Sequence, residues 1–141
     1  MTNKLLLDTT VLIDLSRGND DAADFVDAAI ASQSELFVSV ISAMELIWGC
    51  RDKAEVKKIQ NLIADFQLLQ LSPLVSTQAY ELMLTYSKSH HLAIPDALIA
   101  ATAIVSELEL ATDNERHFRM IVTTQRCHFE AVFAEKSSRC N

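Results

Sequence analysis

Short apolar runs alternate along the chain with longer segments whose apolar residues recur at helical spacing. The run Leu5-Leu6-Leu7 ends in Asp8, a pattern that predicts a buried strand whose last residue reaches the edge of a sheet. Similar short runs predict further strands over residues 36–40, 68–71 and 108–111, and a last strand over residues 120–123.

Helices are predicted between these strands. The first begins at Thr9 or Thr10, and the third has Ser39 or Ser42 as its cap. The apolar spacing predicts the later helices over residues 20–32, 42–50, 53–66, 73–90 and 95–107. Strands that alternate with helices in this way are typical of an α/β domain with a mostly parallel central sheet of four to five strands.

The length and composition indicate one domain over residues 1–141. Glycine occurs only twice and proline only twice, so no stretch has the composition of a linker. The longest segment without a charged residue, 66–80, is too polar to span a membrane, and the charged N-terminus does not match a signal peptide. We therefore expect a cytoplasmic protein with no membrane association, whose three separated cysteines are structural thiols.

The charge balance argues against a protein that binds nucleic acid through an overall positive charge. The chain has 12 basic and 19 acidic side chains, a formal net charge of −7. Residues 1–111 hold 7 basic and 15 acidic side chains, whereas residues 112–141 hold 5 basic and 4 acidic ones. Any anion-binding surface is therefore expected to draw on the C-terminal part of the chain.

Four carboxylates lie within or directly after apolar segments, where an unpaired charge is costly. Asp8 and Asp113 end predicted strands, and Asp96 begins a helix that is apolar nearly all round. Glu45 is the only charged residue between residues 36 and 50. Taken singly, Asp8 also fits a helix cap, and Glu45 also fits an exposed residue of a first helical turn.

The predicted fold brings these four carboxylates together. The carboxyl ends of parallel strands share one edge of a sheet, and helices begin at that edge, so a single acidic pocket is expected there. A hard divalent cation such as Mg²⁺ or Mn²⁺ takes oxygen ligands and would remove the repulsion among the carboxylates. Zinc is disfavoured, because the cysteines and histidines lack ligand spacing.

Four segments, within residues 5–13, 39–46, 94–101 and 110–118, carry a resemblance to a known family. Their central residues are Leu7-Asp8-Thr9-Thr10, Met44-Glu45-Leu46, Ile94-Pro95-Asp96-Ala97 and Thr112-Asp113-Asn114. In order and spacing these segments resemble the PIN domain, and most of all the VapC-type toxins of bacterial toxin-antitoxin pairs. The resemblance covers roughly residues 4–120, and the chain beyond lacks the Pro-Gly turn of many relatives.

The resemblance implies a three-layer α/β/α fold and a Mg²⁺- or Mn²⁺-dependent endoribonuclease. Carried over by motif, Asp8 and Asp96 would be the principal metal ligands, and Glu45 would bind the metal or orient its water. The residues expected to contact substrate are Thr9, Thr10, Asn114 and Arg116. Similar toxins cut structured RNA such as transfer RNA, form homodimers and are silenced by an antitoxin that lies over the cleft.

The fourth acid departs from the family pattern. In the motif, threonine is followed by a variable residue and then by Asp or Asn, so the alignment points to Asn114, whereas Asp113 is the charged neighbour. We count Asp113 among the catalytic and metal-binding residues, and expect it to add negative potential and to reach the metal through water. Asn114 is expected to shape the site beside it.

Two other function classes remain open on the sequence alone. The Leu7-to-Val11 segment also fits the nucleophile loop of haloacid-dehalogenase-like phosphatases, although the second aspartate of that loop is replaced by Thr10. A non-catalytic acidic binding module would use the same carboxylates only as caps or cation hosts. His117, His90 and His91 are expected to be ordinary surface residues, and Trp48 to lie in the core or at a partner interface.

Overall fold

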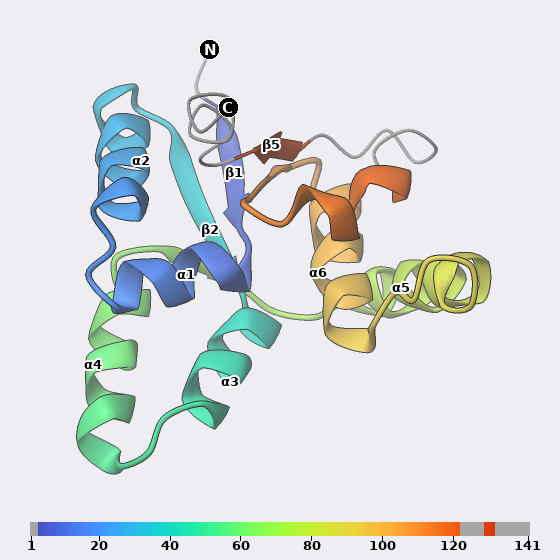
Figure 1. Ribbon diagram of the computed structural model, residues 1–141. Helices are drawn as coiled ribbons and strands as arrows, with labels where there is room; N and C mark the ends of the chain where they lie inside the picture. The colour runs from blue at the N-terminus through green and yellow to red at the C-terminus, as the bar shows by residue number, and fades with distance from the viewer. Residues whose placement is uncertain (1–2, 122–128, 132–141) are drawn as a thin grey trace, which may run out of the picture.

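The strands form one parallel sheet with helices on both faces (Figure 1). The computed structural model describes residues 3–121 and 129–131. The strand order across the sheet is β3-β2-β1-β4-β5, and every pairing is parallel. The strands are β1 (Lys4–Leu7), β2 (Glu35–Ser39), β3 (Gln67–Leu69), β4 (Glu109–Thr112) and β5 (Phe129–Ala131). The expected parallel sheet is confirmed.

Helices connect the strands in the described part of the chain. They are α1 (Thr9–Ser16), α2 (Asp20–Ala31), α3 (Val40–Trp48), α4 (Lys53–Ile63), α5 (Pro73–Tyr86), α6 (Ile94–Val105) and η1 (Glu115–His117). None of the helices within residues 3–121 and 129–131 is long and apolar enough to cross a membrane.

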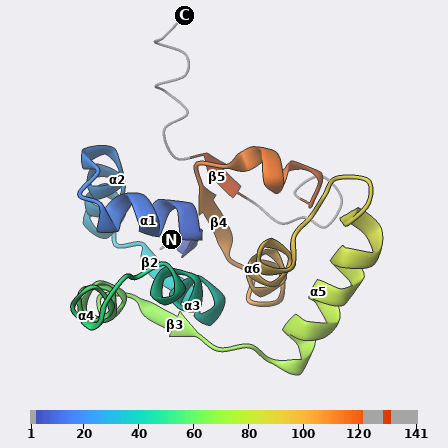
Figure 2. The same cartoon turned by 60° about the horizontal axis from the view of Figure 1, so that its bottom comes forward.

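Alternate residues of the central strand β1 face two separate apolar layers. Leu6 belongs to the core formed with α5 and α6, whereas Leu5 and Leu7 belong to the core formed with α1, α2 and α4. Figure 2 shows the two groups of helices on opposite sides of the sheet. The three-layer α/β/α arrangement expected from the resemblance is therefore present, and burial on both faces of β1 explains why Leu5, Leu6 and Leu7 form an unbroken apolar run.

Helix α6 is central, as its apolar composition predicted. Its alanines let it pack closely against α5 and the sheet, and six residues of the helix are buried: Ala97, Ile99, Ala100, Ala101, Thr102 and Ala103. The helix begins at Ile94 with Pro95 in its first turn. This packing fixes the amino end of α6, which carries Asp96, against the rest of the domain.

One edge of the sheet positions the candidate site. β1 is followed at that edge by Asp8 and α1, β2 by α3, and β4 by the turn that leads into η1. Ser39, at the end of β2, caps α3 by accepting a hydrogen bond from the Ile41 amide at 3.1 Å. The sequence had left the cap open between Ser39 and Ser42, and the structure selects Ser39.

The predicted last strand over residues 120–123 is wrong for its described part. Residues 119–121 are helical, residues 122 and 123 lie outside the described residues, and the fifth strand is instead β5. Phe118 and Ile121 are both buried, at 1% exposure each. Side chains three residues apart share one face of a helix, so helical spacing lets both enter the core, which an extended strand would not.

The cysteine prediction is supported where the structure describes it. Cys50 is a half-buried free thiol whose Sγ donates to the Leu46 carbonyl at 3.3 Å. Cys127 and Cys140 lie outside the described residues.

Candidate functional site

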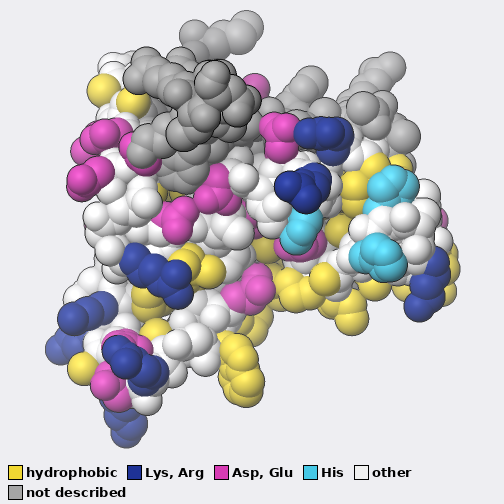
Figure 3. Space-filling model, in the orientation of Figure 1, with side chains coloured by type: hydrophobic (Ala, Val, Ile, Leu, Met, Phe, Trp, Pro, Cys, Tyr) yellow, Lys and Arg dark blue, Asp and Glu magenta, His cyan; other side chains and the backbone are white. Residues whose placement is uncertain are grey.

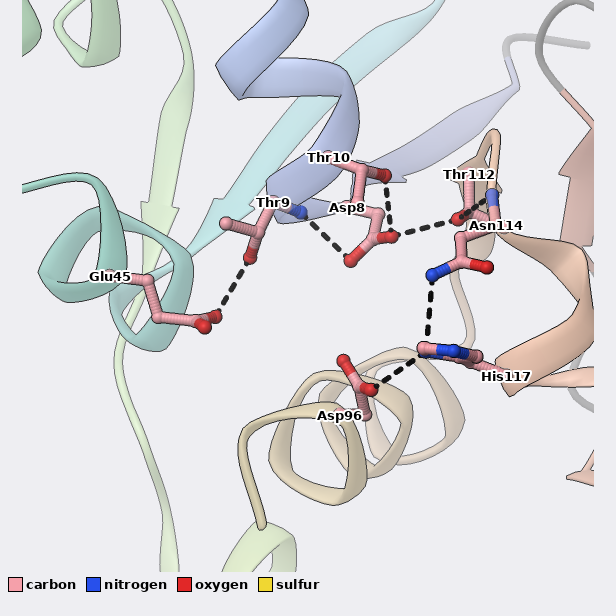
Figure 4. A network of polar contacts seen from close by, with 8 residues as sticks. All are labelled: Asp8, Thr9, Thr10, Glu45, Asp96, Thr112, Asn114 and His117. Atoms are coloured by element: carbon pink, nitrogen blue, oxygen red, sulfur yellow. Dashed lines mark hydrogen bonds and ion pairs between the residues drawn. The ribbon is translucent and has the colours of Figure 1, made fainter. Parts of the chain in front are cut away.

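Asp8 is a buried carboxylate held by three hydrogen-bond donors (Figure 4). Its side chain caps α1, and Oδ1 accepts from the Thr9 amide at 2.8 Å. Oδ2 accepts from the hydroxyls of Thr10 and Thr112, at 2.9 Å and 2.7 Å. The residue is only 2% exposed. The cap and the functional carboxylate, which the sequence had presented as alternatives, are thus compatible roles of the same side chain.

The contact between Asp8 and Thr112 follows from strand register. β1 and β4 are parallel neighbours with Leu7 opposite Ala111, and the Asp8 amide continues this ladder by donating to the Ala111 carbonyl at 2.9 Å. The residues that follow Leu7 and Ala111 are Asp8 and Thr112, so these two residues are also neighbours across the sheet. Thr112 is fully buried, and its Oγ1 also accepts from the Asn114 amide at 2.9 Å. One hydroxyl thus links Asp8 to the turn after β4.

The surroundings of Asp8 oppose its ionisation. Burial raises the pKa of the Asp8 carboxyl, hydrogen bonds from Thr112, Thr10 and Thr9 lower it, and the nearby charge of Asp96 raises it again, with the overall direction upward. A cation between Asp8 and Asp96 would offset both contributions that raise this pKa. This electrostatic arrangement is typical of functional sites.

Glu45 is tied to the same centre through Thr9. The Thr9 hydroxyl donates to Glu45 Oε1 at 2.9 Å, while the Thr9 amide donates to Asp8. Because that hydroxyl has one proton, the 2.8 Å contact between Thr9 and Ser42 requires the buried Ser42 hydroxyl to be the donor. Glu45 is half-buried. The isolated carboxylate of α3 therefore does have the polar partner that its apolar surroundings led us to expect.

Asp96 faces this centre from the amino end of α6, and it contacts the turn after β4 (Figure 4). Its Oδ2 lies 3.3 Å from His117 Nδ1, and the same ring nitrogen lies 3.1 Å from Asn114 Nδ2. His117 therefore connects Asp96 to Asn114. The prediction that His117 is an ordinary surface residue does not account for these two contacts, although the side chain is 56% exposed.

Asp113 lies beside a different acid. It is exposed and interacts with Asp14 of α1, where burial and the Asp113 carboxylate both raise the pKa of Asp14. Together with Thr10, Ile13 and Asn114 these two acids line a shallow cavity. The side chain that meets the Asp96 cluster is thus Asn114, the position indicated by the family motif, and a direct metal contact of Asp113 stays a prediction. Arg116 is exposed, and its role toward substrate also stays a prediction.

The side chains at this edge offer carboxylate oxygens, the type of ligand that a hard divalent cation prefers. Within residues 3–121 and 129–131, no three His, Cys, Asp or Glu side chains form a complete metal cage. Magnesium does not need one, because it commonly binds through one or two carboxylates and completes its shell with water and substrate phosphate. Asp8 and Asp96 supply such a pair, and the half-buried Glu45 lies beside them.

Two threonines expected to contact substrate hold carboxylates in this structure, and their contact with substrate stays a prediction. The hydroxyl protons of Thr9 and Thr10 are donated to Glu45 and Asp8. Sequence reasoning missed Thr112 and Ser42 as parts of the site. Their signal was the presence of hydroxyl side chains at a strand end and in the first turn of an apolar helix, beside two of the predicted acids.

The comparison with known families agrees with this geometry. The profile of the PIN domain matches residues 5–121. This chain belongs to the PIN-domain family. The PIN domain is 38% identical over 117 residues to a protein of Mycobacterium tuberculosis named Ribonuclease VapC10, covering 82% of this chain and 86% of that protein. It is 31% identical over 121 residues to Ribonuclease VapC19 of the same species, covering 85% and 96%.

Solved structures share the fold. A toxin-antitoxin complex from Klebsiella pneumoniae aligns with a TM-score of 0.68 at 28% identity, covering 81% of this PIN domain and 89% of that chain. VapBC2 from Rickettsia felis, bound to a DNA fragment from its promoter, aligns with a TM-score of 0.75 at 21% identity, covering 90% and 97%. The resemblance stated from the motifs is confirmed, and the haloacid-dehalogenase alternative is not supported.

Proposed function

We propose that this PIN domain is a Mg²⁺- or Mn²⁺-dependent endoribonuclease and the toxin of a toxin-antitoxin pair. The observation that carries the proposal is the buried Asp8 carboxylate, held by three donors and facing Asp96 at the carboxyl edge of a PIN-type sheet. Relatives at 38% and 31% identity bear the name ribonuclease. The reaction proposed is hydrolysis of RNA phosphodiester bonds, with transfer RNA as the substrate to test first.

The chemistry divides between the chain and its cation. A divalent cation held by Asp8 and Asp96 would supply positive charge that stabilises the phosphoryl transition state and makes water a better nucleophile. Glu45 lies next to Asp8 through Thr9 and is placed to bind the cation or to orient the attacking water. Asp113 adds negative potential at the margin, and Asn114 shapes the site through His117.

The protein's own hydrogen bonds prepare this arrangement. Thr9, Thr10 and Thr112 stabilise the ionised form of Asp8 against its burial, so the carboxylate is available as an anionic ligand. The same donors prevent the carboxylate from rotating. A ligand held in advance costs less entropy when the cation and substrate bind.

RNA cleavage assays test the proposal. Purified protein is incubated with total transfer RNA in Mg²⁺, in Mn²⁺ and in excess chelator, beside an Asp96→Asn variant prepared in the same way. Cleavage that requires the metal and disappears in the variant supports the proposal. Cleavage at the full rate in chelator contradicts metal dependence, and absence of cleavage with every RNA tested favours the non-catalytic binding module.

We also propose a homodimer and an antitoxin partner. Large apolar side chains lie exposed over α3, α5 and the start of α6, where hydrophobic atoms gather on the lower surface in Figure 3. They include Trp48 at 88%, Leu74 at 69%, Leu84 at 65%, Tyr80 at 64% and Ile94 at 63% exposure. Trp48 therefore lies outside the core. Several large apolar side chains exposed on one side of a domain are typical of protein interfaces.

Two measurements test these partners. Sedimentation should give the mass of a dimer, and co-expression with the product of a neighbouring small gene should relieve growth arrest caused by the toxin. A strictly monomeric protein contradicts the homodimer, and growth that continues normally on expression contradicts the toxin. The cytoplasmic location stays a prediction.

A further inference from the structure

A second cavity borders the carboxylate site and is lined by cations. It has a volume of about 570 Å³ and lies between α1, α3 and α4. This volume is within the roughly 300–1,000 Å³ range of ligand pockets. Glu45 belongs both to this cavity and, through Thr9, to the network around Asp8. The cavity therefore shares Glu45 with the site at which we place the chemistry.

The charged residues of the cavity wall are Arg17, Arg51, Lys58, Glu45 and Glu55. Glu55 is paired with Arg51, whose Nη2 lies 2.9 Å from Glu55 Oε1 and whose amide and Nε also donate to that carboxylate. Neither Arg17 nor Lys58 takes part in an ion pair within 4.0 Å among the residues that the structure describes. Arg17 interacts with Asp14, and Lys58 with Glu55, only through longer-range electrostatics, so no direct ion pair within the described residues neutralises these two cations in the cavity wall.

The basic residues of this acidic protein concentrate here. Seven Lys and Arg residues occur in residues 1–111, and five of them lie in α4 or in the wall of this cavity: Arg17, Arg51, Lys53, Lys57 and Lys58. Figure 3 shows Lys and Arg side chains gathered over α1 and α4. The sequence led us to expect an anion-binding surface in the C-terminal part of the chain. That expectation stays a prediction, and the fold brings together a further group of basic side chains from residues 17–58.

We propose that this cavity holds the RNA backbone next to the phosphodiester that is cleaved, with Arg17 and Lys58 contacting its phosphates. This inference rests on the proposed ribonuclease function. Lysine and arginine contacts to phosphate position a nucleic acid without reading its sequence. Ile13, Leu46 and Cys50 add apolar wall against which a ribose or base can lie. The cations thus draw a polyanion across an otherwise repulsive acidic centre.

RNA binding by a cleavage-deficient background tests the proposal. A fluorescein-labelled single-stranded RNA is titrated with Asp96→Asn protein at several salt concentrations. The titration is repeated with three further proteins, in which Arg17→Gln, Lys58→Gln or both are combined with Asp96→Asn. The slope of log K against log salt is negative, and each lost phosphate contact should reduce its magnitude by about 0.7. The double variant should lose about 1.4 in slope, and binding should weaken at every salt concentration.

Lys57→Gln is the matched control. Lys57 and Lys58 are exposed neighbours on α4 and the substitutions change net charge equally, but only Lys58 lines the cavity. Equal losses for both variants would show a general charge effect and overturn the proposal, as would a double variant with unchanged slope. Unchanged RNA binding with loss of the antitoxin complex would assign the cavity to a protein partner and also overturn it.

Cleavage assays separate this inference from the proposed function. The cavity substitutions are also made in protein that keeps Asp96. If these variants bind and cleave RNA as well as the native protein does, the cavity inference fails but the proposed function stands. If that protein neither binds nor cleaves RNA, the proposed function fails, and the cavity inference fails with it. Circular dichroism of each variant confirms that a loss of binding is not a loss of fold.

Discussion

His117 Nδ1 lies 3.3 Å from Asp96 Oδ2 and 3.1 Å from Asn114 Nδ2. Without a proton, Nδ1 can accept a hydrogen bond from the Asn114 side-chain amide; with a proton, it can donate one to the Asp96 carboxylate. It cannot do both at once. Whichever bond forms, the imidazole restricts the orientation of the Asp96 carboxylate. His117 is thus a positioning residue for a proposed metal ligand.

We predict that His117→Asn keeps most activity, whereas His117→Gln loses it. The amide nitrogen of asparagine can replace Nδ1, which makes both contacts to Asp96 and Asn114, but that of glutamine reaches about as far as Nε2 and so misses the position of Nδ1. Loss of an outer-shell partner commonly costs about 10- to 100-fold in metal affinity or activity. Mg²⁺ titrations of cleavage should therefore show a raised metal requirement for His117→Gln.

His91→Gln is a suitable control, because His91 is exposed and is not part of the network of Asp8, Asp96 and His117 in Figure 4. Equal activity of His117→Asn and His117→Gln would remove the positioning role. So would a loss of kcat in both variants with the metal requirement unchanged.

The sequence located the acids because each has a local signal. Asp8 ends a run of leucines, and Asp96 follows Pro95 at the start of an apolar helix. Both patterns depend only on neighbours in the chain. The parallel sheet edge then implied that the acids converge, and the structure brings Asp8 and Asp96 near enough to interact.

The hydroxyl framework could not be predicted in the same way. The bond from Thr112 to Asp8 joins residues 104 positions apart, and it exists because β4 lies beside β1 in the sheet. Strand order is a property of the whole fold and has no local signal. The choice between Asp113 and Asn114 depends likewise on a bend fixed by the bond from the Asn114 amide to Thr112.

We predict that Asp8→Asn and Asp96→Asn each abolish metal-dependent RNA cleavage while the fold survives. Replacing one anionic oxygen removes a ligand charge but leaves the shape of the side chain nearly unchanged. The loss should exceed the roughly 10- to 100-fold cost of an outer-shell change. Without metal, Asp96→Asn should melt slightly above the native protein, since one of two repelling carboxylates is gone. Retained cleavage in Asp96→Asn would contradict the assignment.

We predict that Thr112→Val destabilises the protein by about 1–3 kcal/mol, because it removes a buried donor from the Asp8 carboxylate. The same change should raise the pKa of Asp8 further, since the Thr112 bond is the strongest contribution that lowers it. A higher Mg²⁺ concentration should then be needed for cleavage. Urea unfolding measures the first effect and a metal titration the second.

Thr102→Val provides the matched comparison for this variant. Thr102 is also buried, but its hydroxyl donates at 2.8 Å to the Leu98 carbonyl within α6, away from any carboxylate. It should cost less stability and leave the Mg²⁺ requirement unchanged. Identical metal titrations for the two valine variants would show that Thr112 has only a structural role.

The interaction of Asp14 with Asp113 predicts a pH dependence of stability. Burial and Asp113 raise the pKa of Asp14 above 3.8, so the folded protein binds this proton more tightly than the unfolded chain does. The contribution to stability is therefore present below pH 3.8 and is lost as pH rises through the raised pKa. Asp113→Asn should reduce that loss. Urea unfolding at several pH values, beside Asp27→Asn on α2 as a control, measures the difference.

The same Asp113→Asn variant decides how Asp113 acts toward the metal. If Asp113 contributes only potential and water-mediated contact, the Mg²⁺ concentration needed for cleavage should rise only slightly, because its carboxylate lies with Asp14 at the margin of the site. Asn114→Ala should raise that concentration more, since it removes the amide that contacts His117 beside Asp96. A large rise for Asp113→Asn alone would identify Asp113 as a direct ligand and would require its side chain to turn from Asp14 toward Asp8 when the metal binds.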